Sequence, residues 1–300
     1  MSKLSFNNGF HERVGTLTEA LPYIRQWSGK TVVVKYGGAA MTDPELQRSV
    51  MKDLVLLHYV GVRVVLVHGG GKAISAMMEK LGEEPEFVGG LRVTGASTME
   101  IVQMVLVGSV GQQLVSLLNA EGGRAVSLSG KDANMIVACK KECPEGDLGY
   151  VGQVESIDTH AITCLTENGY IVCLAPVGVG PDARSYNINA DTVASAVAAK
   201  LGAEKLVLLT DVKGIMKDVD DPDTLISSAT LDEARRLLED GTVVGGMIPK
   251  VEACIEAVEQ GVSRAHLIDG RMEHSLLMEL FTEQGVGSMI VAGEDNSNDE

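Results

Sequence analysis

Short apolar runs that alternate with helix-length segments are the feature that most limits the folds open to this chain. Runs rich in valine, isoleucine and leucine occur at 31–35, 62–67, 124–128, 170–174 and 205–210. Segments with the length and apolar spacing of helices occur at 44–60, 72–81, 98–120, 191–201 and 231–240. Buried strands separated by helices are typical of a mostly parallel sheet that is covered on both faces. The pattern therefore predicts an α/β fold, and 300 residues are enough for two lobes.

Segments outside this alternation set the predicted boundaries of the chain. Residues 11–28 have apolar side chains at helical spacing, interrupted by Pro22, which predicts a helix that packs either on its own domain or on another subunit. The region 135–160 has shorter, mixed signals that predict a small antiparallel hairpin. Glycines and a proline near residue 180 mark a loop after which the strand–helix pattern restarts. We predict an N-terminal extension helix at 1–30, a first lobe at 31–180, a second lobe at 181–292 and a disordered tail at 293–300.

Charge and composition exclude several classes of partner. A formal net charge of −16 argues against nucleic acid, which is bound by clustered lysine and arginine, although a local positive pocket can still hold a small anion. No run approaches the roughly 20 apolar residues of a membrane span, and the N-terminus lacks the apolar core of a signal peptide. We therefore expect a cytoplasmic protein without a membrane partner. The five cysteines are odd in number and scattered, which is typical of a reducing compartment and predicts no metal centre.

Two glycine-rich turns follow consecutive apolar strands. The sequence KYGGAAM contains Gly37 and Gly38, and HGGGKAIS contains Gly69, Gly70 and Gly71. Glycines let the backbone approach an oxyanion closely, and a following helix N-terminus adds unpaired N–H groups and a positive dipole end. Because both turns fall at the carboxyl edge of a parallel sheet, we expect them to lie side by side as an anion site. A tight strand-to-helix turn without a ligand is the alternative.

Four charged residues stand out beside these turns. Lys35 ends an apolar strand, and Lys250 follows a glycine pair and a proline at the start of a predicted helix, where a lysine is ordinarily a surface residue. Asp191 precedes a helix of small residues. It either caps this helix or orients the lysines through its carboxylate. Arg92 follows two glycines, where it either forms a surface salt bridge or captures a carboxylate or phosphate.

Together these residues favour phosphoryl transfer. The sequence offers lysines, an arginine, glycine turns and amides such as Asn187, but no evident Ser/His/Asp or Cys/His arrangement. Phosphoryl transfer requires positioning and charge neutralisation rather than covalent chemistry from the protein. Neither glycine turn has the spacing of a P-loop or of a dinucleotide fingerprint, so a nucleotide would be held in another way.

Six segments resemble the amino-acid kinase family. In chain order they are VVVKYGGAAM, VVLVHGGGKAIS, GLRVTGASTMEIVQMVLVG, SYNINADTVA, LVLLTDVKGI and GGMIPKVEACIEAVEQGV. Among these, GLRVT, NINAD and GGMIPK are similar to the members that act on N-acetyl-L-glutamate. The resemblance covers about residues 31–290. It implies a three-layer α/β/α sandwich with an open, mostly parallel central sheet, preceded by the N-terminal extension helix.

The resemblance also implies a reaction and a role for each motif. ATP would phosphorylate the side-chain carboxylate of N-acetyl-L-glutamate to an acyl phosphate, the second step of arginine biosynthesis, with Mg²⁺ carried by ATP and no metal held by the protein. The implied roles are phosphoryl transfer for Lys35, Lys250 and the orienting Asp191, phosphate binding for Gly37 and Gly38, and substrate binding for Gly70, Gly71, Arg92 and Asn187. A catalytically idle regulator that binds nucleotide or arginine on the same fold is the alternative.

The two ends of the chain resemble family members that are inhibited by arginine. Those members have an N-terminal extension that links dimers into a ring-shaped hexamer, and a carboxyl-terminal segment similar to HLIDGRMEHSLLMELFTEQGVGSMI. The implied arginine contacts are Tyr23, His266, Glu279 and Gly285, and a carboxylate such as Glu279 suits a guanidinium ligand. A plain terminal helix and strand is the alternative. We therefore expect a homo-oligomer, a trimer of dimers, with L-arginine as inhibitor and a PII-type signal protein as a further candidate partner.

Overall fold

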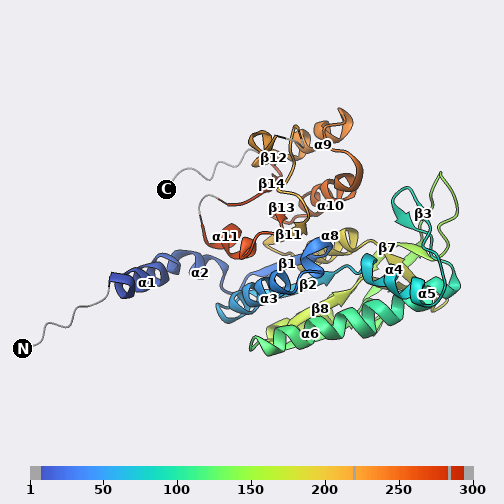
Figure 1. The fold of residues 1–300 in the computed structure, drawn as a ribbon, viewed down its shortest axis with the longest axis horizontal. Helices are drawn as coiled ribbons and strands as arrows, with labels where there is room; N and C mark the ends of the chain where they lie inside the picture. Colours follow the sequence, from blue (N-terminus) through green and yellow to red (C-terminus); the bar gives the residue numbers. More distant parts are fainter. Residues whose placement is uncertain (1–7, 219–220, 283–284, 294–300) are drawn as a thin grey trace, which may run out of the picture.

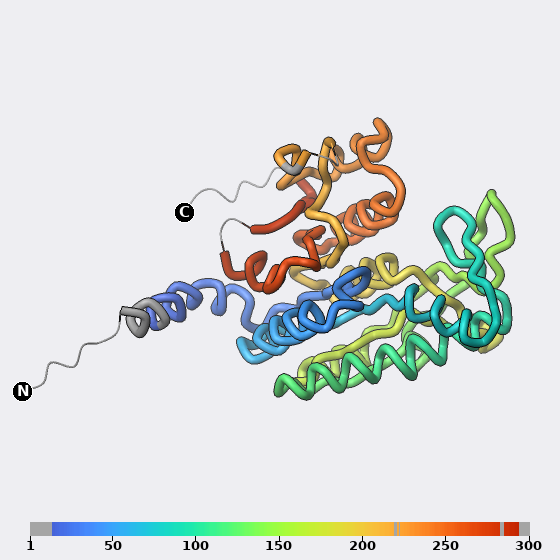
Figure 2. Tube along the Cα trace, viewed as in Figure 1, coloured from blue at the N-terminus to red at the C-terminus, as the bar shows by residue number. Residues whose placement is uncertain are grey.

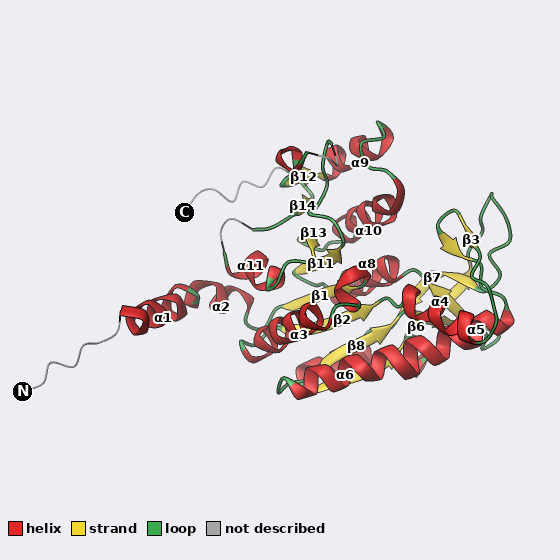
Figure 3. Ribbon diagram, in the orientation of Figure 1, coloured by secondary structure: helices red, strands yellow, loops and turns green. Residues whose placement is uncertain are grey.

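The computed structural model describes residues 8–218, 221–282 and 285–293 and has the predicted α/β architecture (Figure 1). The central sheet has eight strands in the order β12-β14-β13-β11-β1-β2-β8-β5. Neighbouring strands are parallel, apart from the antiparallel pair β13–β14. Its strands are β1 (Thr31–Tyr36), β2 (Arg63–His68), β5 (Ala125–Ser129), β8 (Ile171–Ala175), β11 (Lys205–Thr210), β12 (Ser228–Thr230), β13 (Arg264–Asp269) and β14 (Ser288–Val291). Helices cover both faces (Figure 3), which confirms the predicted α/β/α sandwich.

The helices follow the strands in the predicted order. They are α1 (Asn8–Glu19), α2 (Leu21–Trp27), α3 (Pro44–Tyr59), α4 (Gly71–Lys80), α5 (Ala96–Gln103), α6 (Gly111–Ala120), α7 (His160–Glu167), α8 (Ala190–Leu201), α9 (Leu231–Glu239), α10 (Ile248–Glu259) and α11 (Ser275–Phe281). The predicted helices at 44–60, 72–81, 191–201 and 231–240 match α3, α4, α8 and α9 to within one residue at each end. Local apolar spacing therefore located these elements well.

The helix predicted at 98–120 is a long element formed by α5, a π-helical segment (Met104–Val110) and α6. By length and composition, the span Ala96–Ala120 could cross a membrane, which corrects the expectation that no segment approaches such a span. Most of its exposed positions carry small or amide side chains and Glu100 is the one charged residue in this span, so the mean hydropathy stays high. In the protein α6 packs against β5 and β8, and 44% of the apolar window is buried. The helix therefore covers one face of the sheet.

The side chains of β1 divide between two apolar layers. Val32 and Val34 are buried in the layer beneath α3, α4 and α6. Val33 is buried in the layer that contains α8 and α10. Because side chains alternate along a strand, Lys35 points to the same side as Val33. The strand thus directs its lysine toward the first turns of α8 and α10.

Two smaller units stand at one end of the sheet. The strands β6 (Ile136–Lys140), β7 (Val151–Ile157), β9 (Val177–Val179) and β10 (Ser185–Ile188) form a small closed sheet. The pair β6–β7 is antiparallel, which confirms the hairpin predicted between 135 and 160. Beside it, β3 (Phe87–Val88) and β4 (Leu91–Arg92) form a second antiparallel hairpin (Figure 1).

The N-terminal extension consists of two helices that project from the body of the molecule (Figure 2). The helix predicted at 11–28 breaks at Ala20, and α2 restarts with Pro22 in its first turn, where a missing N–H costs nothing. Trp27 anchors α2, because its indole N–H donates to the carbonyl oxygen of Leu280 on α11 at 2.7 Å. Of the predicted disordered tail, residues 294–300 lie outside the described residues.

Candidate active site

The two lysines and the aspartate singled out in the sequence meet at one point. Lys35 lies near the end of β1, and Asp191 and Lys250 lie in the first turns of α8 and α10. The Nζ atom of Lys35 is 2.9 Å from Oδ1 of Asp191, and Nζ of Lys250 donates to Oδ2 at 3.1 Å. A single carboxylate therefore holds two ammonium groups that come from different parts of the chain.

Asp191 can take this position because another residue caps its helix. The side chain of Asn189 accepts hydrogen bonds from the backbone N–H of Asp191 at 2.7 Å and of Thr192 at 3.4 Å. The interpretation of Asp191 as the N-cap is therefore wrong. An N-cap residue precedes the first helical residue, whereas α8 begins at Ala190. Because Asp191 follows the first residue of the helix, its carboxylate is free to bind the two lysines.

Burial and charge act on Asp191 in opposite directions. Its side chain is 5% exposed, and burial by itself would raise its pKa. The charges of Lys35 and Lys250 and their hydrogen bonds outweigh this effect and hold the pKa of Asp191 below its usual value. The carboxylate therefore stays ionised at neutral pH. The side chain of Lys250 is 21% exposed, so N–H groups remain for a ligand.

The first glycine turn lies directly against Lys35. A Cβ atom on Gly37 would come within 3.0 Å of Nζ of Lys35. Gly38 has a φ of +69°, and a Cβ atom there would collide with the carboxylate of Asp211. Oδ1 of Asp211 accepts a hydrogen bond from the backbone N–H of Ala39 at 2.6 Å. Gly38 is thus required by its backbone conformation, Gly37 leaves room for the ammonium of Lys35, and Asp211 fixes the turn from the end of the neighbouring strand β11.

Sequence reasoning gave Asp211 no role, although it lies in the segment LVLLTDVKGI. A usable signal was present, because a polar residue directly after an apolar strand is the same pattern that identified Lys35. The contact itself was not visible in chain order, since β1 and β11 become neighbours only in the folded sheet. Asp211 belongs to the site as the residue that positions the first glycine turn.

The second glycine turn opens directly into α4. Gly70 is the N-cap residue and Gly71 the first helical residue, and no side chain caps the backbone N–H groups of this turn. Such N–H groups form a ready site for an anion. The backbone N–H of Gly69 donates to the carbonyl oxygen of Tyr36 at 2.8 Å, which ties this turn to the end of β1. The two turns therefore lie side by side, as their positions after neighbouring strands predicted.

Arg92 is buried beside the second turn, with a side chain that contacts neutral groups. Its Nη2 atom donates to the carbonyl oxygen of Gly71 at 3.0 Å and to Oγ of Ser75 at 2.7 Å. Its Nη1 atom donates to Sδ of Met78 at 3.3 Å, and the guanidinium lies 4.7 Å from the centre of the Phe87 ring. No carboxylate forms an ion pair with Arg92 among the residues that the structure describes. The interpretation of Arg92 as a surface salt bridge is therefore wrong.

Asn187 is connected to Arg92 through Thr94. The Nδ2 atom of Asn187 donates to Oγ1 of Thr94 at 3.2 Å, and Thr94 donates to the carbonyl oxygen of Arg92 at 2.9 Å. Thr94 is fully buried and was not singled out from the sequence, although it belongs to the quoted segment GLRVT. Asn187 lies on β10 and Arg92 on β4, so this network joins two parts of the chain that sequence order separates.

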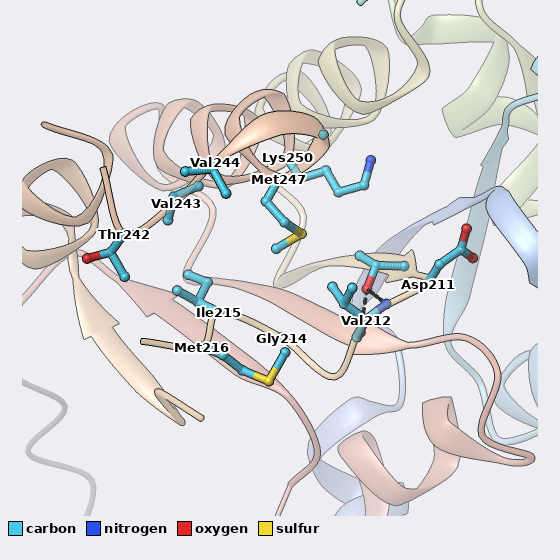
Figure 4. A pocket seen from close by; sticks show the side chains of 12 residues that line it. Asp211, Val212, Gly214, Ile215, Met216, Thr242, Val243, Val244, Met247 and Lys250 are labelled. Atoms are coloured by element: carbon cyan, nitrogen blue, oxygen red, sulfur yellow. Dashed lines mark hydrogen bonds between the residues drawn. The ribbon is translucent and has the colours of Figure 1, made fainter. Parts of the chain in front are cut away.

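A pocket of about 410 Å³ lies next to Lys250 (Figure 4). Its lining comes from three segments: Thr210–Val212, Gly214–Met216 and the region from Thr242 to Lys250. In Figure 4 the ammonium of Lys250 and the carboxylate of Asp211 lie on one side, and apolar side chains such as Val243 and Ile215 lie on the other. The pocket can therefore hold an apolar or aromatic group beside an anionic one.

A second buried carboxylate cluster contains two of the predicted arginine contacts. Oε1 of Glu279 lies 2.7 Å from Nδ1 of His266 and accepts a hydrogen bond from Nζ of Lys205 at 3.0 Å. Its Oε2 atom accepts from the backbone N–H of Val286 at 2.8 Å. Burial alone would raise the pKa of Glu279, but these partners lower it to about 2. Burial lowers the pKa values of Lys205 and His266.

The other two predicted arginine contacts lie around this cluster. A side chain on Gly285 would approach Oε2 of Glu279 to 3.1 Å. Tyr23 packs edge-on against Phe281 at the end of α11, with ring centres 6.3 Å apart. The structure therefore places Gly285 beside the carboxylate, and Tyr23 of α2 against the end of α11, the helix that carries Glu279.

Sequence reasoning missed two members of the second cluster. Lys205 begins β11, and its ammonium lies 5.0 Å from the centre of the Trp27 ring. A lysine directly before a buried apolar run is a visible signal, and it mirrors the lysine that ends β1. Trp27 is the single tryptophan of the chain and is 5% exposed. It closes the cluster from the side of α2.

Most of the chain matches one known protein family. A model of the amino acid kinase family matches residues 30–269. The chain therefore belongs to the amino acid kinase family.

Similar proteins within this family are named acetylglutamate kinase. The acetylglutamate kinase of Symbiobacterium thermophilum is 53% identical over 286 residues, which cover 93% of this chain and 98% of that protein. The acetylglutamate kinase of Thermosynechococcus vestitus is 54% identical over 280 residues, which cover 93% of this chain and 94% of that protein.

Solved structures share the fold. N-acetylglutamate synthase from Neisseria gonorrhoeae, in complex with coenzyme A and N-acetyl-glutamate, has a TM-score of 0.81 and 30% identity. The match covers 93% of this chain and 63% of the synthase, so this chain spans less than two thirds of that protein. Carbamate kinase from Giardia lamblia bound to AMP-PNP, at 21% identity, has a TM-score of 0.62 and covers 88% of this chain and 99% of that one.

Proposed function

We propose that this chain transfers the γ-phosphoryl group of ATP to the side-chain carboxylate of N-acetyl-L-glutamate and forms N-acetyl-L-glutamyl 5-phosphate, the second step of arginine biosynthesis. The observation that carries the proposal is the buried Asp191, which holds Lys35 and Lys250 beside two glycine turns. The name of the curated relatives supports the same reaction. The idle-regulator alternative is not favoured, because the groups that transfer requires are all in place.

The lysine pair supplies the electrostatics of the proposed transfer. Lys35 and Lys250 lie on either side of the migrating phosphoryl group and neutralise the negative charge that spreads over its oxygens. Asp191 holds both ammonium groups before ATP binds, so little reorganisation is required during the reaction. Backbone N–H groups of Gly37 and Gly38 bind phosphate oxygens. The mechanism therefore relies on fixed charges and donors rather than on a covalent intermediate.

The acid is proposed to bind on the opposite side of Lys35, Lys250 and Asp191 from ATP. Arg92 and Asn187 hold the substrate carboxylates, and the backbone N–H groups of Gly70 and Gly71 complete the site. Support comes from the lack of a carboxylate partner for Arg92 among the described residues, because a substrate carboxylate would supply that partner. Two fixed contacts to the acid orient the attacking oxygen toward the phosphoryl group, which lowers the entropy cost of the reaction.

ATP is proposed to bind in the second lobe, at 181–292, and the acid in the first lobe, at 31–180. All residues that line the pocket beside Lys250 fall between Thr210 and Lys250, which supports this division. Mg²⁺ would be carried by ATP and would supply further neutralisation of phosphate charge. The described residues contain no group of three His, Cys, Asp or Glu side chains that could hold a metal ion.

A hydroxylamine trap tests the reaction. Purified protein is incubated with ATP, Mg²⁺, N-acetyl-L-glutamate and hydroxylamine, which converts an acyl phosphate to a coloured hydroxamate. We expect hydroxamate that depends on each component, and little product when L-aspartate or carbamate replaces the acid. Folded protein that gives no hydroxamate would refute the proposal.

We also propose feedback inhibition by L-arginine at the cluster of Tyr23, His266, Glu279 and Gly285. A second structure of the Neisseria gonorrhoeae synthase, in complex with coenzyme A and L-arginine, matches at a TM-score of 0.79 and 28% identity and supports arginine binding on this fold, without indicating where. Its match covers 65% of that chain. The pKa of Glu279 is lowered to about 2, so its carboxylate is ionised at neutral pH, and an ionised carboxylate suits a guanidinium. Activity that is unchanged at millimolar arginine would rule out this regulation.

The proposed assembly is a hexamer built as a trimer of dimers through the N-terminal helices. The exposed apolar side chains of Val14, Leu17 and Leu21 on α1 and α2 support it. Sedimentation of the full chain tests the assembly, and a species no larger than a dimer would contradict it. A PII-type signal protein as partner and a cytoplasmic location remain predictions.

A further inference from the structure

Helix α4 presents three hydrogen-bond acceptors to Arg92 along one face. They are the carbonyl oxygen of Gly71, the hydroxyl of Ser75 and the thioether of Met78. Spacings of four and three residues place these groups above one another on a helix. The same helix begins at the second glycine turn, with Gly70 as its N-cap. One rigid element thus carries the free backbone N–H groups of the turn and the contacts to the arginine.

All three acceptors are neutral. They satisfy N–H groups of the guanidinium without cancelling its charge, and Phe87 adds the face of an aromatic ring. Arg92 is 8% exposed, and burial lowers its pKa from its usual value. No carboxylate pairs with it among the residues that the structure describes. The site therefore fixes the orientation of the guanidinium while its charge remains available to a ligand.

We infer that Ser75 is a positioning residue that holds Arg92 in place for the substrate carboxylate that is not phosphorylated, so that α4 joins this arginine and the second glycine turn into one unit. The inference rests on the proposed function. Of the three acceptors, Gly71 contributes a backbone carbonyl and Met78 a weakly accepting sulfur. The Ser75 hydroxyl, at 2.7 Å, is the strong contact that comes from a side chain.

The bond geometry explains why Ser75 matters for orientation. The same Nη2 atom of Arg92 donates to both Gly71 and Ser75. These two contacts fix the guanidinium relative to the first turn of α4, where the N–H groups of the second glycine turn lie. Without the hydroxyl, the guanidinium could rotate away from Gly71, and the substrate would have to restore its orientation on binding.

Steady-state kinetics with Ser75→Ala and Ser75→Thr test the inference. We expect Ser75→Ala to raise KM for N-acetyl-L-glutamate about tenfold, the worth of one charge-assisted hydrogen bond, with kcat changed less than about twofold. KM for ATP should stay unchanged. Threonine keeps the hydroxyl and should restore most of the native KM. The matched control is Ser116→Ala on α6, which removes a serine hydroxyl that donates to the carbonyl oxygen of Gln112 in its own helix.

A substrate analogue separates positioning from a general structural effect. N-acetyl-L-isoglutamine keeps the side-chain carboxylate that accepts the phosphoryl group but replaces the other carboxylate with an amide. If Ser75 acts through Arg92 and that carboxylate, Ser75→Ala should raise KM much less for the analogue than for the natural acid. An equal rise for both acids, or no rise for either, would overturn the inference.

Folding and the proposed reaction are controlled separately. Alanine is a strong helix former, so we expect Ser75→Ala to keep the native melting temperature. Ser75→Cys, which has a weakly accepting sulfur, serves for the same comparison if the alanine variant unfolds. An inactive wild-type protein would refute the reaction and not the inference. Calorimetry of N-acetyl-L-glutamate on the wild type and Ser75→Ala would then decide, with equal affinities overturning the role of Ser75.

Discussion

Asp191 and Glu279 are buried carboxylates that each contact two basic side chains, and they differ in how these partners are arranged. Asp191 has one lysine at each of its oxygens, and one of those lysines lines a pocket. Glu279 has Lys205 and His266 at one oxygen and a backbone N–H at the other. The side chain of Lys205 is 4% exposed. The first cluster leaves N–H donors for a ligand, whereas both oxygens of Glu279 in the second already have partners within the protein.

The two clusters lie at opposite ends of the same pair of strands, β1 and β11. In the register of β1 and β11, Lys35 lies opposite Leu208, and Val32 lies opposite Lys205. Three residues along a strand correspond to roughly 10 Å. One cluster therefore lies where the strands end and the helices α8 and α10 begin, and the other where β11 starts. We expect the first to control turnover and the second to control stability and regulation.

Replacing Lys35 by alanine should have the largest effect. Loss of one fixed charge at the migrating phosphoryl group should lower kcat by about 10²- to 10³-fold, as for other preorganised donors. Stability should change little, because Asp191 keeps Lys250 as a partner. The hydroxamate rate and thermal unfolding measure the two effects. Native turnover in this variant would remove the lysine from its proposed role and end the contrast between the clusters.

Replacing Glu279 by glutamine should affect stability instead. A folded pKa of about 2 against an ordinary value of 4.5 corresponds to about 3 kcal/mol at neutral pH. Because the folded pKa is depressed, this contribution is present above about pH 4.5 and is lost as the pH falls toward 2. Turnover without arginine should stay near the native value. Denaturant unfolding at pH 7 and pH 3 measures the difference, and equal stabilities at pH 7 would contradict it.

Asp53 is a third buried carboxylate to compare with Asp191 and Glu279, and it has one imidazole partner. Its side chain is 1% exposed, and Oδ1 lies 2.6 Å from Nδ1 of His274. Burial outweighs this partner and raises the pKa of Asp53 to about 6. A raised folded pKa stabilises the protein below the unfolded value of 3.8 and loses that contribution as the pH rises through about 6.

The variant Asp53→Asn tests this reasoning. Asparagine should stabilise the protein by about 3 kcal/mol at pH 7, because it removes a charge that burial disfavours. Below about pH 4 the gain should vanish. Unfolding curves at pH 4 and pH 7 provide the measurement. A loss of stability at pH 7 would show that the bond to His274 is worth more than the cost of burial.

Trp27→Phe should have the smallest effect. Phenylalanine keeps a ring over Lys205 but removes the indole N–H that donates to Leu280, which should cost about 1 kcal/mol. Thermal unfolding measures this loss. Turnover without arginine should not change. Reduced turnover in a variant of native stability would show that the second cluster acts on the first.

Much of the fold was visible in the sequence because the relevant patterns are local. The apolar runs at 31–35 and 205–210 predicted β1 and β11 to within one residue. Glycines and a lysine at the end of the first strand located one edge of the candidate site. The capping of α8 was mistaken, because the choice between Asn189 and Asp191 depends on a shift of one residue at the helix start. Local spacing does not resolve such a shift.

Local patterns along the chain are enough to identify the available chemical groups and the edge of the sheet that carries them. Which groups meet depends on the folded chain: Asp191 contacts both lysines, Asp211 contacts the backbone of Ala39, and Ser75 contacts Arg92. The physical reason is that strand and helix periods act over a few residues, whereas these contacts depend on the order of strands in the sheet. That order is set by packing of the whole chain.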